Sequence, residues 1–105
     1  MKTTEEVARD LNEALRPWRG ATARLWNFTA SLNLLEIRLE RADQPGNAHL
    51  RCLSCVRLRA EVGWQPANLA VEVASNDMLR IVDNAANLIV ECSHASVLLD
   101  VSPVH

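Results

Sequence analysis

The chain has 105 residues, of which 49% are hydrophobic and 23% are charged, and its formal net charge is −2. This length and composition are typical of one globular domain with one hydrophobic core, so we expect residues 1–105 to form a single domain. The small negative charge argues against a general affinity for nucleic acid or anionic membranes. Its apolar runs are much shorter than the roughly 20 residues of a transmembrane helix.

The N-terminal segment has the pattern of an amphipathic helix. Thr3 precedes Glu6 by three residues, which is the spacing of a capping box, and apolar residues then recur every three or four positions. Pro17 and Gly20 end the pattern, which predicts a helix over about 4–16. Because this segment contains acidic residues and no secretory apolar core, we expect a cytoplasmic protein.

From residue 22 the apolar period changes to two, which is typical of β-strands. Apolar residues occupy even positions from Trp26 to Leu34 and odd positions from Leu35 to Leu39. Because a β-bulge shifts a strand by one residue, we predict one strand over about 22–40 with a bulge near 34–35. Two shorter strands joined by a turn are the alternative, although the stretch lacks Gly, Pro and Asp at that point.

The next turn signal, at 43–47, precedes a second alternating segment, which predicts a strand over about 48–64. The two long strands would pair as a hairpin. In this hairpin Trp26 would lie opposite Trp64, with both rings packed in the core. An aromatic-lined ligand pocket or partner surface is the alternative for these rings.

The rest of the chain predicts four short strands separated by turns, over about 67–74, 78–83, 87–92 and 97–102. Consecutive strands joined by tight turns form an antiparallel meander. A row of alternating charges would then cross its outer side, from Arg59 through Glu72 and Arg80 to Glu91. We therefore predict an α+β fold, in which one N-terminal amphipathic helix packs on a strongly bent antiparallel meander sheet of about six strands that can curl into a half-barrel.

Three cysteines raise the question of a metal site. Cys52 and Cys55 have C-x-x-C spacing, and with Cys92 and His94 they would supply the four ligands of a structural zinc site. Against this alternative, residues three apart on an extended strand point to opposite faces. A thioredoxin-like redox pair would need a helix directly after the cysteines, and no helix is predicted there. We interpret Cys52 and Cys92 as buried apolar side chains and predict no cofactor.

A cysteine-dependent enzyme is a further hypothesis. Cys92 would act as the nucleophile, with His94 and either Asp83 or Asp100 as its partners. Asp83 has a simpler explanation as a turn residue that hydrogen-bonds the nearby backbone. The chain contains no G-x-S-x-G sequence and no phosphate-binding glycine loop, so we assign no catalytic residue.

The leading hypothesis is therefore a small soluble domain that binds a protein partner without catalysis. One candidate surface is the outer face of the second long strand, where His49, Arg51 and Arg57 suit an acidic partner. The other is the last strand, SVLLDVSPV at 96–104, whose low charge would favour pairing with a second copy at a sheet edge. A homodimer is one prediction, and neither nucleic acid nor a membrane is expected as a partner.

Overall fold

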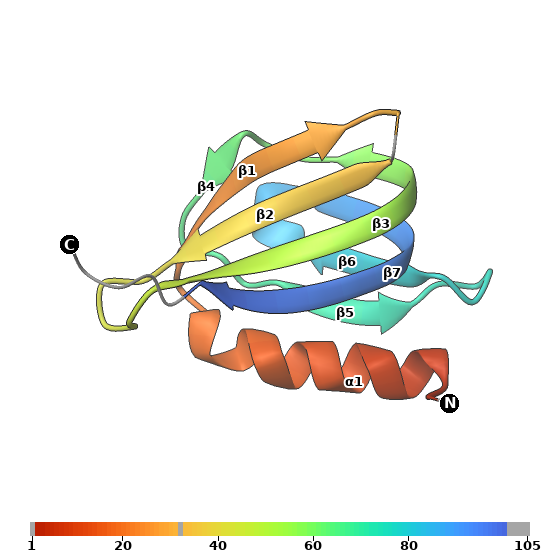
Figure 1. Cartoon of the computed structure of the whole chain (residues 1–105), viewed down its shortest axis with the longest axis horizontal. Helices are drawn as coiled ribbons and strands as arrows, with labels where there is room; N and C mark the ends of the chain where they lie inside the picture. The colour runs from red at the N-terminus through yellow and green to blue at the C-terminus, as the bar shows by residue number, and fades with distance from the viewer. Residues whose placement is uncertain (1, 32, 101–105) are drawn as a thin grey trace.

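The computed structural model describes residues 2–31 and 33–100. Within these residues one helix, α1 (Thr4–Leu15), packs against a curled antiparallel sheet of seven strands, so the predicted α+β half-barrel is confirmed (Figure 1). The strands are β1 (Thr22–Thr29), β2 (Leu34–Glu40), β3 (Asn47–Arg59), β4 (Gly63–Trp64), β5 (Ala70–Val73), β6 (Leu79–Asp83) and β7 (Leu88–Asp100). Two short 3-10 helices are η1 (Arg16–Trp18) and η2 (Asn84–Ala86). No helix in the described part of the chain has the length and apolar character needed to cross a membrane.

The helix α1 begins with the capping box expected from the sequence. The side-chain oxygen of Thr3 accepts a hydrogen bond from the Glu6 N–H (3.2 Å), and Oε1 of Glu6 accepts one from the Thr3 N–H (3.3 Å). These bonds satisfy two donors that a helix start otherwise leaves without partners. The apolar face of α1 is buried against the sheet through Ala8, Leu11 and Leu15.

The free edge of β5 is covered by α1. Asn12 donates from Nδ2 to the backbone C=O of Val71 and accepts at Oδ1 from the Val71 N–H, both at 2.8 Å. An uncovered strand edge tends to pair with other chains. The Asn12 amide therefore docks the helix and satisfies this part of the edge at the same time.

The strand order across the sheet is β4-β1-β2-β3-β7-β6-β5, which confirms the strongly bent antiparallel meander. The predicted pairing of the strand at 48–64 with that at 67–74 is wrong, because β3 pairs with β7. The sets β1-β2-β3 and β5-β6-β7 are each consecutive, and the two sets join through β3 and β7. The predicted strands at 87–92 and 97–102 belong to one strand, β7, as far as residue 100, and 101–104 lie outside the described residues. Because β6 pairs only with 88–92, the described part of β7 beyond that range has β3 as its one strand neighbour. Self-association through this edge stays a prediction.

The single strand expected over 22–40 is also wrong. A turn separates β1 from β2, and the two strands pair as an antiparallel hairpin. Asn33, in this turn, has a φ of 49°, a left-handed conformation that Asn adopts more readily than most residues. The phase change in the sequence therefore comes from the turn and not from a bulge near 34–35. A bulge does occur in β1, where the register shifts at Trp26.

Trp64 and Asp83 join β4, at one end of the curled sheet, to β6, the strand next to the other end. Nε1 of Trp64 donates to Oδ2 of Asp83 (2.9 Å), and the backbone N–H of Asn68 donates to the same oxygen (2.8 Å). Asp83 is 1% exposed and bonds groups 15 and 19 positions away, so the predicted local turn role is wrong. Trp64 pairs with Ala23, whereas Trp26 is 51% exposed, so the predicted core contact between Trp26 and Trp64 is wrong as well.

The predicted row of charges is confirmed on three strands. Glu72, Arg80 and Glu91 lie opposite one another on β5, β6 and β7. Nε of Arg80 is 2.9 Å from Glu91 Oε2, and Nη1 of Arg80 is 3.6 Å from Glu72 Oε1. The prediction that Arg59 is the fourth member of this row is wrong. The neighbour of β3 is β7, and their register places Arg57 opposite Glu91.

Candidate binding site on the outer face of the sheet

Five charged or aromatic side chains lie close together on the outer face of β1, β2 and β3, and we call them the outer-face cluster: Trp26, Glu36, Arg38, His49 and Arg51. The register brings them together, because Arg38 pairs with His49 and Glu36 pairs with Arg51. On β2 and β3 these residues alternate with fully buried core residues, so they point to the opposite face of the sheet.

Glu36 is the electrostatic centre of the outer-face cluster. Its Oε2 lies 3.0 Å from Nδ1 of His49 and 3.8 Å from Nη2 of Arg51. The side chains of Glu36 and His49 are each 12% exposed, whereas that of Arg51 is 43% exposed. The acid is therefore covered, and the guanidinium of Arg51 remains partly open to solvent.

Trp26 lies over this group from β1. It is the residue that the β1 bulge leaves without a partner on β2, and bulges commonly turn a side chain in a new direction. The guanidinium carbon of Arg38 is 4.3 Å from the centre of the Trp26 ring, which is a cation–π contact. The ring also meets His49 edge to face, with 6.3 Å between centroids and 76° between planes.

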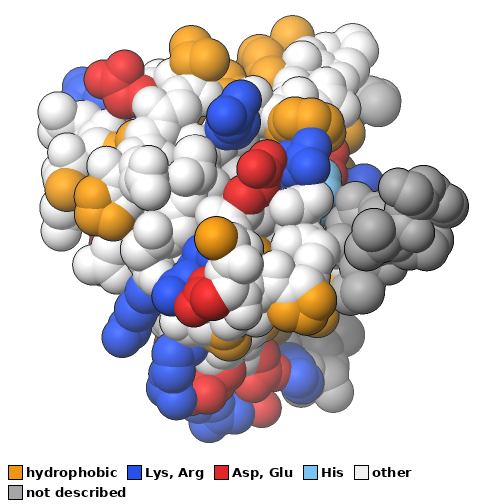
Figure 2. Space-filling model, turned by 90° about the vertical axis from the view of Figure 1, so that its left-hand side faces the viewer, with side chains coloured by type: hydrophobic (Ala, Val, Ile, Leu, Met, Phe, Trp, Pro, Cys, Tyr) orange, Lys and Arg blue, Asp and Glu red, His pale blue; other side chains and the backbone are white. Residues whose placement is uncertain are grey.

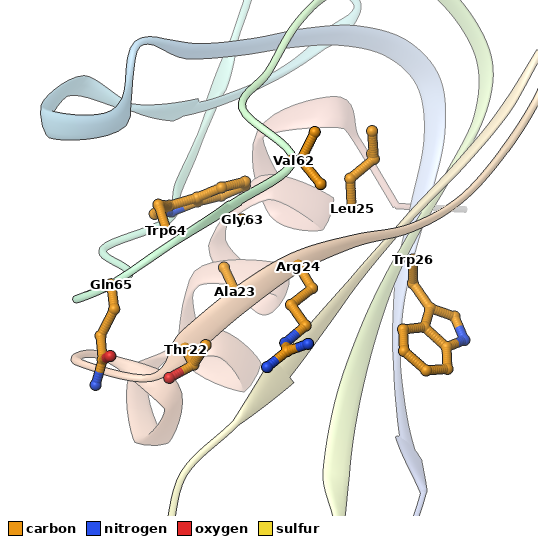
Figure 3. Close-up of a pocket in the computed structure, with 9 residues that line it drawn as sticks. All are labelled: Thr22, Ala23, Arg24, Leu25, Trp26, Val62, Gly63, Trp64 and Gln65. Atoms are coloured by element: carbon orange, nitrogen blue, oxygen red, sulfur yellow. The ribbon is translucent and has the colours of Figure 1, made fainter.

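A shallow hollow of about 630 Å³ lies beside the outer-face cluster, between β1 and the segment 62–65. In Figure 3, Arg24 and Trp26 project from one side of β1, whereas Leu25 and Val62 project to the other side. Trp26 thus belongs both to the wall of the hollow and to the cluster. A ligand chain lying across the cluster could continue into this hollow.

The end of the molecule on the left of Figure 1 faces the viewer in Figure 2. Hydrophobic side chains appear there as small separate groups, and cationic and acidic side chains lie close to one another (Figure 2). This face is therefore mixed in character. A partner that contacts it would have to match polar and charged groups as well as apolar ones.

Two of the three predicted site residues come together. His49 and Arg51 belong to the outer-face cluster, whereas Arg57 lies further along β3 and opposite Glu91. Glu36 and Arg38 were not predicted from the sequence, and Trp26 was expected in the core, with a ligand pocket or partner surface as the alternative. Arg38 alternates with core residues on β2 in the same way as His49 does on β3, but only the pairing of the two strands shows that they meet.

The three cysteines lie where β3 and β7 bend, and we call Cys52, Cys55 and Cys92 the cysteine corner. Ser54 has a left-handed φ of 56°, which shifts the phase of β3 so that Cys52 and Cys55 both pack against the core. The expectation that they point to opposite faces is therefore wrong. On β7, Cys92 faces the same core directly opposite Cys55.

The predicted zinc ligands do not assemble. His94 is exposed and pairs with the exposed residue Leu53 on the outer side, whereas Cys52 and Cys92 are buried. Among residues 2–31 and 33–100, no group of three or more His, Cys, Asp or Glu side chains is arranged to hold a metal ion.

The thiols are also poorly placed for a catalytic nucleophile at neutral pH. Burial, with a smaller effect of Cys92, raises the pKa of Cys55 to about 11, so Cys55 is protonated at neutral pH. The hydrogen bond between Cys52 and Cys92, aided by burial, raises the pKa of Cys52, and the same bond lowers that of Cys92 against the effect of burial. Cys92 is 0% exposed, and its contact with His94 is made by the backbone of His94. The side chain of Asp100 lies outside the described part of the structure.

Comparisons with protein-family models, with curated proteins and with solved structures found no match. The function is therefore inferred from the geometry of the chain itself. The outer-face cluster is the strongest candidate, because it joins a half-exposed Trp to a partly exposed Arg on the solvent side of the sheet.

Proposed function

We propose that the domain is a non-catalytic binding module whose outer-face cluster recognises an acidic segment of a partner protein. The observation that supports this most is the position of Trp26, which lies over Arg38 at the bulge in β1 with 51% of its surface exposed. Leaving a large aromatic ring outside the core forfeits apolar burial. Trp and Arg are also the residue types most enriched at the energetic centres of protein interfaces.

The accessible charge of this surface favours an acidic partner. Glu36 is covered by its contacts with His49 and Arg51, and so contributes little exposed negative charge. Arg24, which pairs with Arg38 across β1 and β2, is exposed on the same face. A guanidinium can form two parallel hydrogen bonds with one carboxylate, which makes Arg24 and Arg51 suitable contacts for Asp or Glu side chains.

A peptide-binding measurement tests this proposal. The probe is a fluorescein-labelled decapeptide of alternating Glu and Leu, compared with decapeptides in which Lys or Ser replaces Glu. We expect the acidic peptide to bind most tightly, and its affinity to fall as salt rises, because exposed charge pairs are screened. Trp26→Ala and Arg51→Ala should each weaken binding by about tenfold, which equals about 1.4 kcal/mol.

The chain offers matched controls for both variants. Phe28 is 49% exposed but pairs with the buried Leu35, so Phe28→Ala removes a similarly exposed ring from the opposite face. Arg59→Ala is the control for Arg51→Ala, because Arg59 is also an exposed arginine on β3 but lies further along the strand, beyond the cysteine corner. Both controls should bind as the parent protein does. Equal losses in the controls, or no preference for the acidic peptide, would contradict the proposal.

A further inference from the structure

Cys55 and Cys92 have the backbone geometry of a cross-strand disulfide. They are direct partners on the antiparallel strands β3 and β7, and both face the core. The N–H of Cys55 donates to the C=O of Asn33 (3.2 Å) and therefore points away from β7. Partners of this kind form a pair without mutual hydrogen bonds, with Cα atoms about 4.5 Å apart. That separation lies within the range of roughly 4.4 to 6.8 Å seen in disulfides.

We propose that the cysteine corner is an oxidation site, in which a low-molecular-weight disulfide such as oxidised glutathione converts Cys55 and Cys92 into a disulfide. The deprotonated sulfur of Cys55 forms a bond to one glutathione sulfur, while the S–S bond of oxidised glutathione breaks and one glutathione leaves. The sulfur of Cys92 then attacks Cys55 and displaces the second glutathione. The protein loses two protons and two electrons, and these reduce one oxidised glutathione to two thiols.

Exposure assigns the first step to Cys55. Cys52 and Cys92 are both 0% exposed, whereas Cys55 is only half-buried and can be reached first. The thiol of Cys52 hydrogen-bonds that of Cys92, but Cys52 is offset along the strands, because its direct partner on β7 is Ala95. A bond from Cys52 to Cys92 would have to span this offset, whereas Cys55 and Cys92 are direct partners. Cys52 therefore remains a thiol in the oxidised protein, and the new bond fastens β3 to β7 where both strands bend.

The reaction should be slow at neutral pH and faster in alkali. Thiolates attack disulfides and thiols do not, and burial keeps the pKa of Cys55 near 11. Below that pKa the thiolate fraction rises about tenfold for each unit of pH. We therefore expect the initial rate with oxidised glutathione to rise about tenfold between pH 7.5 and pH 8.5.

The test treats the full-length protein with excess oxidised glutathione, blocks the remaining thiols and maps the tryptic peptides by mass spectrometry. Trypsin cleaves after Arg51 and Arg57, so Cys52 and Cys55 stay on one hexapeptide, 52–57, and Cys92 lies on 81–105. We expect two of the three thiols to be lost and these two peptides to be linked. The oxidised protein should melt roughly 10 °C above the reduced one, because a cross-link restricts the unfolded chain.

Single variants test whether Cys55 or Cys52 forms the disulfide with Cys92. Cys52→Ala should still form the link, and Cys55→Ala should not; Cys52→Ser takes the place of Cys52→Ala if circular dichroism shows that the alanine variant does not fold. A link that survives in Cys55→Ala, a disulfide within 52–57, an adduct on Cys55 that proceeds no further, or no thiol loss at pH 8.5 would each overturn the proposal.

Discussion

Trp64 and Trp26 belong to neighbouring strands, yet they serve two different regions of the molecule. Trp64 on β4 is half-buried and donates its indole N–H to the buried carboxylate of Asp83, which joins β4 to β6. Trp26 on β1 is half-exposed, and its ring face lies over the cation of Arg38. Both residues pair an aromatic ring with a charged group, but only the first pair is enclosed.

One backbone irregularity, the bulge in β1, explains why Trp26 does not share the core face with Phe28. Trp26 lies on the outer face together with Arg24, two positions earlier, and the register shift at Trp26 then reverses the phase, so that Phe28 faces the core. The unbroken alternation expected from the sequence predicted a core position for both rings. Ala23, which comes before the bulge, faces the core and pairs with Trp64. We therefore expect the Trp64 region to determine stability and the Trp26 region to determine binding.

The largest effect on stability should come from Asp83→Ala. This change leaves two donors, the indole N–H of Trp64 and the backbone N–H of Asn68, without their acceptor in a partly buried place. Hydrogen bonds to charged groups contribute about 1.5 to 3 kcal/mol each, so we expect a loss of about 3 kcal/mol in the free energy of unfolding. Urea denaturation of the parent protein and the variant measures this loss in the free energy of unfolding.

Asp83→Asn is the matched control, because it keeps one oxygen that can accept from both donors. It should lose clearly less stability than Asp83→Ala. A loss below about 1 kcal/mol for Asp83→Ala would show that the contact between Trp64 and Asp83 does not hold β4 to β6.

Trp26→Ala should have a smaller effect on stability. The ring is half outside the protein, and an exposed cation–π contact contributes only about 0.5 to 1 kcal/mol. We expect the free energy of unfolding to fall by about 1 kcal/mol or less. A loss as large as that of Asp83→Ala would mean that Trp26 belongs to the core, and would contradict its assignment to a binding surface.

Local signals in the sequence predicted the parts of the fold that depend on near neighbours. The capping box of Thr3 and Glu6 predicts where α1 begins, because its bonds span three residues. The pairing of Glu72 with Arg80 also follows from a short turn between adjacent strands. Charge and alternation were sufficient at these positions, since chain connectivity left few other arrangements.

The sequence contains one signal for the turn between β1 and β2, which is Asn33. This turn contains no Gly or Pro, but Asn33 adopts the left-handed conformation with a φ of 49°. Asn is one of the few residues that tolerate this conformation, so its position between two apolar phases could have indicated a turn. The outer-face cluster depends on this hairpin, which brings Trp26 to the strand that bears Arg38.

The cysteine corner could not be predicted in the same way. Its shape depends on Ser54, which has no marked preference for its left-handed φ of 56°. It also depends on the pairing of β3 with β7, two strands that are distant in the sequence. Without this pairing, alternation alone placed Cys55 on the outer face, although its sulfur packs against the core.

Hydrogen exchange of the tryptophan indole N–H groups tests the contrast between Trp64 and Trp26 most directly. The signals are assigned in a ¹⁵N-labelled sample with single Trp→Phe variants. The indole N–H of Trp64, which is bonded to Asp83, should exchange at least about tenfold more slowly than that of the half-exposed Trp26. Equal protection of the two groups, or stronger protection of Trp26, would contradict the assignment of one ring to the closure of the sheet and the other to its binding face.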